Sequence, residues 1–183
     1  MQEKWTAHFC FIIDTVMESA PRFLCDVMLA RLARYLRAAG LDTTLANESA
    51  TDAQILRDAI DEGRWLLTAD RKIAEHKAAK GHVTQLPFGS LDLQAAALSG
   101  QFNIDWLSHA FTRCLLDNAP LQPATPEHAL QVPEDARLPE GELLACPACG
   151  RVYWRGSHYK RMRKKLESWQ ENPAQFEEIF LPS

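Results

Sequence analysis

The chain has 183 residues, which suits one ordinary domain or a domain of about 100–120 residues with a small appendage. Its composition, 46% hydrophobic and 24% charged, is typical of a soluble globular protein that can bury a core. The net charge of −4 and the isoelectric point near 5.9 argue against a protein that is basic throughout and binds nucleic acid over its whole surface.

No apolar run approaches the roughly 20 residues that a membrane-spanning helix needs. The N-terminal segment FCFII is too short for the core of a signal peptide and ends at Asp14. We therefore expect a cytoplasmic protein with no membrane association.

Strands and helices are predicted to alternate from residue 22 onward, after an extension over 1–21. Buried or β-branched runs predict strands, and apolar residues at helical spacing, with Gly40, Gly63 and Gly81 ending the first three, predict helices. The predicted strands are 22–25, 42–46, 64–68 and 82–86, and the predicted helices are 27–39, 52–62, 70–80 and 90–100. Such alternation with short joints predicts an α/β fold with a mostly parallel sheet flanked by helices.

Three aspartates come at the ends of predicted strands or at the starts of the helices nearby. Asp26 follows the first strand, Asp70 follows the third, and Asp52 opens the helix that precedes the third strand. Strand ends and the following helix starts lie along one edge of a right-handed βαβ sheet, where open sheets bind ligands. The alternative is that each aspartate only caps a helix, where aspartate is a favoured residue.

Carboxylates that converge on one crevice repel one another unless a cation lies among them. Mg²⁺ or Mn²⁺ prefers oxygen ligands and is often held by few carboxylates together with waters and a substrate phosphate. Such a site can activate water against a phosphodiester. Asp26, Asp52 and Asp70 are therefore candidate catalytic residues and candidate ligands of Mg²⁺ or Mn²⁺.

Arginines accompany these aspartates. Arg34 and Arg37 lie beside the apolar face of the first helix, and Arg71 follows Asp70 directly. Close to a metal crevice they would contact RNA phosphates, which match guanidinium geometry. Otherwise they are solvated or paired with acids.

Cysteines predict a second, smaller module after a proline-rich connection over 119–141. Two of the five cysteines stand as Cys146 and Cys149 in CPACG, and Cys114 stands three residues before Asp117. A pair of ligands with two residues between them is called a knuckle, and two knuckles supply the four ligands of a zinc ribbon. Here Cys114 and Asp117 form the first knuckle, with Asp117 in place of a fourth cysteine, and Cys146 and Cys149 form the second. The alternative is a degenerate ribbon that is held by packing without a metal.

Basic residues are concentrated just after the second knuckle. Residues 143–166 carry 7 basic and no acidic residues, whereas residues 167–183 carry four acids and no bases. Arg155, His158, Lys160 and Arg161 alternate there with aromatic residues, a pattern that suits phosphate attraction and base stacking. The alternative is a solvated charged helix, with Trp154 in the ribbon core.

The chain resembles the Mut7-C RNase domain family. The matching stretches are FLCDVMLARLARYLRAAGLDT, TDAQILRDAIDEGRWLLTADR, RCLLDNAPL and CPACGRVYWRGSHYKRM, which together span roughly residues 22–166. The resemblance implies a PIN-like nuclease fold with a zinc ribbon, a metal-dependent ribonuclease activity, and RNA as substrate. It further implies that Asp26, Asp52 and Asp70 are the acidic set and that Cys114, Cys146 and Cys149 bind zinc. The family pattern has cysteine where Asp117 stands here.

Together these features predict four segments: an extension (1–21), a PIN-like nuclease domain (22–112), a zinc-ribbon module with a basic helix (113–166) and an acidic tail (167–183). A non-catalytic module that binds tRNA or ribosomal RNA, with aspartates that serve only as caps, is the main alternative. A protein-interaction domain whose basic stretch meets an acidic partner is the third.

Overall fold

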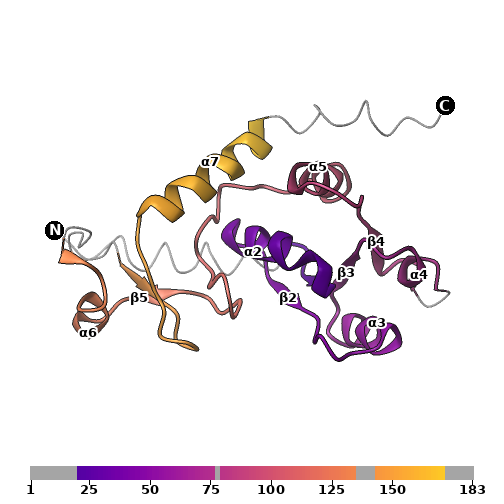
Figure 1. Cartoon of the computed structure of the whole chain (residues 1–183), viewed down its shortest axis with the longest axis horizontal. Helices are drawn as coiled ribbons and strands as arrows, with labels where there is room; N and C mark the ends of the chain where they lie inside the picture. The colour runs from indigo at the N-terminus through magenta and orange to yellow at the C-terminus, as the bar shows by residue number, and fades with distance from the viewer. Residues whose placement is uncertain (1–19, 77–78, 135–142, 172–183) are drawn as a thin grey trace.

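The computed structural model describes residues 20–76, 79–134 and 143–171 (Figure 1). Most of the predicted N-terminal extension, and the predicted acidic tail beyond residue 171, lie outside the described residues. Across the described part, no helix combines the length and the apolar character that a membrane span requires.

A four-stranded parallel sheet organises the chain, as the alternating pattern predicted. Its order is β2-β1-β3-β4. The strands are β1 (Phe23–Cys25), β2 (Thr43–Leu45), β3 (Trp65–Thr68) and β4 (Val83–Gln85). In the register of the central pair, Phe23 lies opposite Trp65 and Cys25 lies opposite Leu67. The α/β fold class is confirmed.

The helices flank this sheet close to their predicted positions. They are the 3₁₀ helix η1 (Val27–Leu29), α2 (Ala30–Ala38), α3 (Asp52–Asp61), α4 (Arg71–Ala74) and α5 (Leu91–Phe102). Helix α4 is shorter than the predicted 70–80 helix. The chain turns after Ala74, with the Ala79 amide donating to the His76 carbonyl, and Ala79 enters the core, 2% exposed. This tertiary burial overrides the local helical preference.

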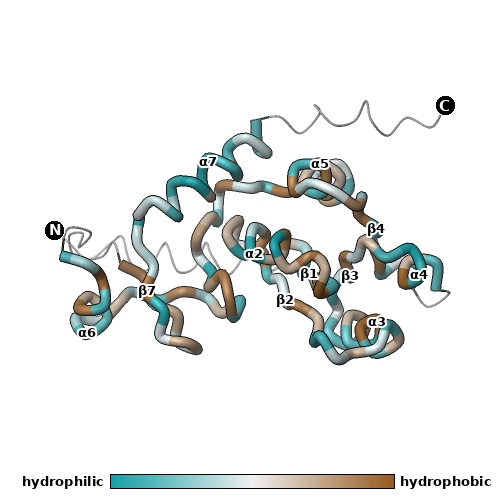
Figure 2. The backbone as a smooth tube through the Cα atoms, viewed as in Figure 1, coloured by the Kyte–Doolittle hydropathy of each residue, from teal (hydrophilic) through white to brown (hydrophobic). Residues whose placement is uncertain are grey.

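Two apolar clusters lie on opposite faces of the sheet, because successive strand residues point to opposite sides. Phe23, Cys25 and Leu67 belong to the cluster under α2 and α5, whereas Leu24 and Leu66 belong to the cluster under α3 and α4. In Figure 2 the tube is apolar along β1 and mostly hydrophilic along α7.

The C-terminal part forms a small antiparallel sheet and then returns to the parallel sheet. Its strands are β5 (Gln122–Pro123), β6 (Leu144–Ala145) and β7 (Val152–Tyr153), with α6 (Pro126–Ala129) between the first two and α7 (Ser157–Glu171) at the end. Met162, Leu166 and Trp169 of α7 are buried in the same cluster as α2 and α5. The boundary predicted at residues 166 and 167 falls inside α7, and the division into segments stays a prediction.

Asp42, at the amino-terminal ends of the parallel strands, connects the parallel sheet to the C-terminal part of the chain. Its Oδ1 accepts hydrogen bonds from Arg64 Nη1 at 2.6 Å and from Asn118 Nδ2 at 2.7 Å. The Asn118 Oδ1 atom in turn accepts a hydrogen bond from the Thr43 amide at 2.9 Å. Partial burial favours the neutral carboxyl, but these hydrogen bonds outweigh it and hold the pKa of Asp42 below its usual range.

We expect Asp42→Asn to lower the free energy of unfolding at pH 7 by about 2 kcal/mol, because a hydrogen-bonded charge is lost. Because the pKa of Asp42 is lower in the folded chain than in the unfolded chain, its carboxylate stabilises the fold fully above the unfolded-state pKa of about 3.9. That stabilisation is lost as the pH falls through the folded-state pKa. The difference between variant and wild type should therefore shrink below about pH 4. Urea unfolding at several pH values measures this, with the exposed Asp58→Asn as control; equal stabilities of Asp42→Asn and wild type at pH 7 would refute it.

Candidate metal centres

The connections of the parallel sheet change direction between β1 and β3. The chain leaves β1 toward β2 on one side, and it leaves β3 toward β4 on the other. In open α/β sheets such a switch point creates a crevice beyond the carboxyl ends of the strands, where ligands bind. Asp26 follows β1 directly and Asp70 follows β3 after one intervening residue, so both lie at the carboxyl ends of the two central strands.

Thr68, the last residue of β3, links the two aspartates. Its Oγ1 donates to Asp26 Oδ2 at 2.7 Å and accepts from the Asp70 amide at 3.0 Å. The Asp26 amide donates to the Leu67 carbonyl at 2.9 Å. Thr68 is fully buried, so its hydroxyl has a fixed environment. Thr68 was not among the predicted site residues. The signal in the sequence was a polar residue at the end of an otherwise apolar strand, two residues before Asp70.

The structure separates capping from other roles for the three aspartates. Asp70 caps α4, since its Oδ1 accepts from the Lys72 amide at 2.7 Å. Asp26 stands at the cap position of η1 but makes no side-chain capping bond. Asp52 is exposed at the start of α3, where Thr51 and Gln54 form the capping box. Capping alone therefore accounts for Asp70 but not for Asp26 or Asp52.

The donors at this edge suit a hard cation. Within the described residues, no hydrogen bond reaches Oδ1 of Asp26 or Oδ2 of Asp70, so each carboxylate keeps an oxygen for a ligand. The three aspartates do not form a group whose oxygens all lie within 4.8 Å of one another. Mg²⁺ typically takes one or two carboxylates and completes its shell with waters and phosphate oxygens, which fits this looser arrangement.

The three arginines predicted to contact RNA occupy different environments. Arg34 is exposed on α2, and Arg71 is exposed with its Nε 3.7 Å from Glu75. Arg37, in contrast, is 7% exposed and donates to the carbonyl oxygens of Thr43, Leu115 and Leu116 at 2.7, 3.0 and 2.6 Å. Arg37 thus joins α2 to the first cysteine knuckle, and its guanidinium is engaged by these carbonyl oxygens rather than exposed.

The four residues predicted to bind zinc come together. The ligand atoms of Cys114, Asp117, Cys146 and Cys149 all lie within 4.8 Å of one another, the one such group among the described residues. The Cys114 and Cys149 sulfurs are 3.9 Å apart, and Asp117 Oδ2 is 3.4 Å from the sulfurs of both Cys114 and Cys146. Tetrahedral zinc with bonds of about 2.3 Å separates its sulfurs by about 3.8 Å, so the group could hold a metal such as zinc.

Neighbouring donors favour the charged form of Cys114. Backbone amides of Leu116 and Asp117 approach its sulfur at 3.4 and 3.3 Å, and the Tyr153 hydroxyl lies 3.1 Å away. Because that hydroxyl accepts from the Leu115 amide, its own proton can point at the sulfur. Burial opposes the thiolate, but these hydrogen bonds outweigh it and lower the pKa of Cys114. Thiolate is the form that binds metals.

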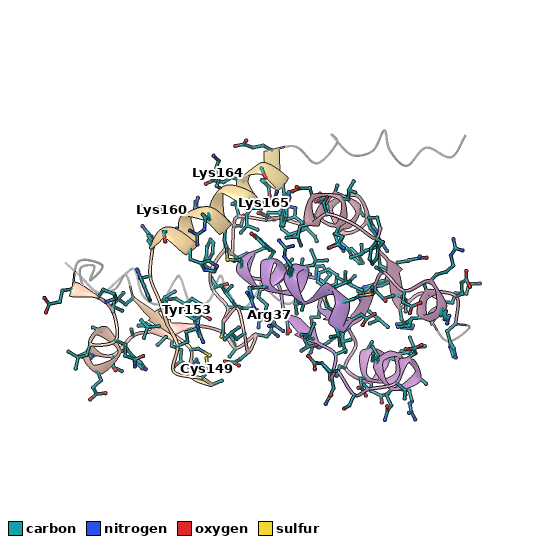
Figure 3. All side chains as sticks on the ribbon, viewed as in Figure 1. Arg37, Cys149, Tyr153, Lys160, Lys164 and Lys165 are labelled. Atoms are coloured by element: carbon teal, nitrogen blue, oxygen red, sulfur yellow. The ribbon has the colours of Figure 1, made fainter. Side chains whose placement is uncertain are left out.

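Tyr153 therefore serves the cysteine group, a role that the aromatic-basic pattern did not suggest. Tyr153 on β7 and Cys149 in the turn before β7 lie on the same side of the molecule, away from the middle of α7 (Figure 3). Arg155, His158, Lys160 and Arg161 are exposed on α7 and the segment before it. Farther along α7, Lys165 pairs with Asp92 of α5 at 2.5 Å. The basic residues most open to a partner thus lie in the first half of α7.

We expect the purified chain to carry about one tightly bound metal ion and Cys146→Ser to lose it, because a four-ligand structural site needs every ligand. Asp117→Cys should retain the metal more tightly than wild type against a chelator. Elemental analysis after chelator challenge measures this, with Cys25→Ala as a control that removes a cysteine outside the group. Metal retained in full by Cys146→Ser would contradict the assignment.

Comparison with known proteins identifies the chain. The model of one family, described as the Mut7-C RNAse domain, matches residues 21–166. No curated protein and no solved structure matches the chain. The family match covers most of the chain, including both groups of candidate ligands, and suggests a ribonuclease-type function. The chain belongs to the Mut7-C RNAse domain family.

Proposed function

We propose that the protein is a metal-dependent ribonuclease that cleaves RNA phosphodiesters at the carboxyl edge of its parallel sheet. The observation that carries the proposal is the placement of Asp26 and Asp70 on either side of the β1–β3 switch point, with Thr68 hydrogen-bonded to both. The family match supports the class of reaction. The proposal places the reaction in the cytoplasm, where cysteines stay reduced and available to a metal.

In this proposal Asp26, Asp70 and Asp52 hold Mg²⁺ or Mn²⁺. An ion held there would activate a water and neutralise charge on the phosphate. The side chains supply position: Thr68 fixes Oδ2 of Asp26, and the Lys72 amide fixes Oδ1 of Asp70. Oδ1 of Asp26 and Oδ2 of Asp70 are left to hold the ion. Asp52 is exposed, whereas Asp26 and Asp70 are half-buried, and it would join the ion from the start of α3.

RNA would be held by exposed cations outside the crevice. We assign this role to Arg34, Arg71, Arg155, His158, Lys160 and Arg161, all of which are exposed. The cysteine group, with zinc as its proposed metal, would have a structural role, because Arg37 and Asn118 fix its first knuckle against the sheet. Figure 3 shows Lys160 on the outer side of α7, away from the parallel sheet.

The Asp70→Asn variant tests the catalytic assignment. Asparagine caps helices as well as aspartate, so α4 should keep its start while the site loses a charged ligand. We expect an unchanged circular dichroism spectrum and Mn²⁺-dependent RNA cleavage reduced about 100-fold or more, the order at which damaged metal sites lose activity. Asp61→Asn, which changes an exposed aspartate at the end of α3, is the matched control. Full cleavage by Asp70→Asn would sink the assignment.

Thr68→Val tests the positioning of Asp26. Valine keeps the shape of threonine but cannot donate to the carboxylate, so we expect a cleavage rate about 10- to 100-fold lower, as for other lost partners of metal ligands. The loss should be partly rescued by raising the Mn²⁺ concentration and fully rescued in Thr68→Ser. A loss that neither Mn²⁺ nor serine restores would indicate damage to the core instead.

The alternative function is a non-catalytic module that binds tRNA or ribosomal RNA. It is favoured by one observation, that Asp70 does cap α4, so that its carboxylate has a structural use without a metal. This alternative predicts salt-dependent RNA binding by wild type with no metal-stimulated cleavage. Cleavage that requires Asp70 and a divalent ion excludes it.

A further inference from the structure

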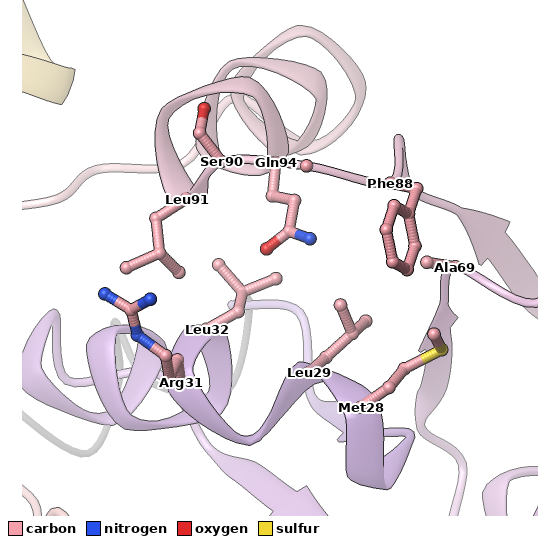
Figure 4. A pocket seen from close by; sticks show the side chains of 10 residues that line it. Met28, Leu29, Arg31, Leu32, Ala69, Phe88, Ser90, Leu91 and Gln94 are labelled. Carbon is pink, nitrogen blue, oxygen red and sulfur yellow. The ribbon is translucent and has the colours of Figure 1, made fainter.

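A pocket of about 370 Å³ opens beside the proposed nuclease site (Figure 4). Its lining comes from η1, from α2, from the residue between Thr68 and Asp70, and from the segment that leads into α5. The lining residues include Met28, Arg31, Leu32, Ala69, Phe88 and Gln94. This volume falls within the range of small-molecule sites, about 300–1,000 Å³.

Phe88 stands at the mouth of this pocket. Its exposed fraction is 85%, the largest among the exposed large hydrophobic residues of the described chain, and Met28 beside it is 50% exposed. Exposing an aromatic ring to water is unfavourable unless a partner covers it. The face of such a ring stacks on unpaired nucleobases of any sequence.

Gln94 places a polar group inside the pocket. Its exposed fraction is 7%, and its Nε2 donates to the Pro87 carbonyl at 3.3 Å. Because a carbonyl only accepts, this bond fixes the amide nitrogen toward Pro87. No described residue donates to the Oε1 atom, and Figure 4 shows the amide end pointing into the pocket. An unpartnered acceptor in this position suits an N–H on the edge of a base.

Arg31 supplies charge at the other end of the pocket. Its guanidinium lies beside Leu91, away from Phe88 (Figure 4), and it is exposed with no ion pair to a described acid. The pocket thus offers an aromatic face near the aspartates, an amide on its inner wall and a cation at its far end. A nucleotide presents the matching groups in that order: a flat base with polar edges and a neighbouring phosphate.

We propose that this pocket binds one unpaired base of the RNA next to the phosphate that is cleaved. The base stacks on Phe88, its edge donates to Gln94 Oε1, and the following phosphate contacts Arg31. This inference rests on the proposed ribonuclease function and adds to it that the substrate is single-stranded at that nucleotide. A base held in a duplex cannot enter the pocket without unpairing.

An RNA with one abasic nucleotide, moved step by step along an unstructured oligonucleotide, tests this proposal. In wild type, loss of the base at one position beside the cleaved bond should slow cleavage about 10-fold, the order of one lost stacking contact. Phe88→Ala should slow cleavage of the intact RNA by a similar factor and show no further loss at the abasic site. Phe88→Tyr, which keeps an aromatic face, should behave as wild type. The control is Leu130→Ala, which truncates a 73% exposed residue just after α6, away from the pocket.

A second arm separates failure of the pocket from failure of the proposed function. Binding of intact and abasic RNA to Asp70→Asn, alone and combined with Phe88→Ala, is measured by fluorescence without any cleavage. If wild type does not cleave RNA but binding still prefers intact over abasic RNA in a way that requires Phe88, the ribonuclease function is overturned. The pocket then remains a base-binding site. Cleavage or binding that is indifferent both to the abasic position and to Phe88→Ala overturns the pocket.

Discussion

The parallel pairing of β1 with β3 positions both the proposed site and the residues around it. It sets Cys25 opposite Leu67, and therefore sets the residues that follow, Asp26 and Thr68, side by side. The hydroxyl of Thr68 then reaches both Asp26 and the amide of Asp70. A slip of one residue in this register would turn every strand side chain to the opposite face and separate these groups. Burial of Leu24 and Leu66 on one face, and of Cys25 and Leu67 on the other, fixes the register.

The second part of the chain is held to this sheet at two places. At the amino edge, Asp42 and Arg37 bind the first cysteine knuckle and the segment after it through buried polar contacts. On the helix layer, α7 buries Trp169 against Trp106 and Tyr35, with ring centroids 4.9 and 5.1 Å apart. The cysteine group therefore lies at the opposite edge of the sheet from Asp26 and Asp70. This separation fits the proposal that one centre stabilises the fold and the other acts on RNA.

Much of this arrangement follows from local sequence patterns. Short apolar runs and helical spacing located the four parallel strands and most of the helices, and CPACG with Cys114 located the cysteine group, including its aspartate. The contacts that local patterns do not contain were missed. Arg37 has the same spacing as Arg34, but burial under Leu115 and Leu116 gives it a different role, and Tyr153 turns to Cys114 because β7 passes beside the knuckle. The pocket also depends on α5 lying over α2, which only the folded chain shows.

The central claim is that the carboxyl edge of the sheet holds a divalent ion between Asp26 and Asp70. Anomalous diffraction from crystals grown with Mn²⁺, recorded at the manganese and zinc edges, tests it directly. The account predicts a manganese peak bound by Asp26 and Asp70, and a separate peak at the cysteine group. Manganese density absent from the two aspartates in well-ordered crystals, at a concentration that supports RNA cleavage, would contradict it.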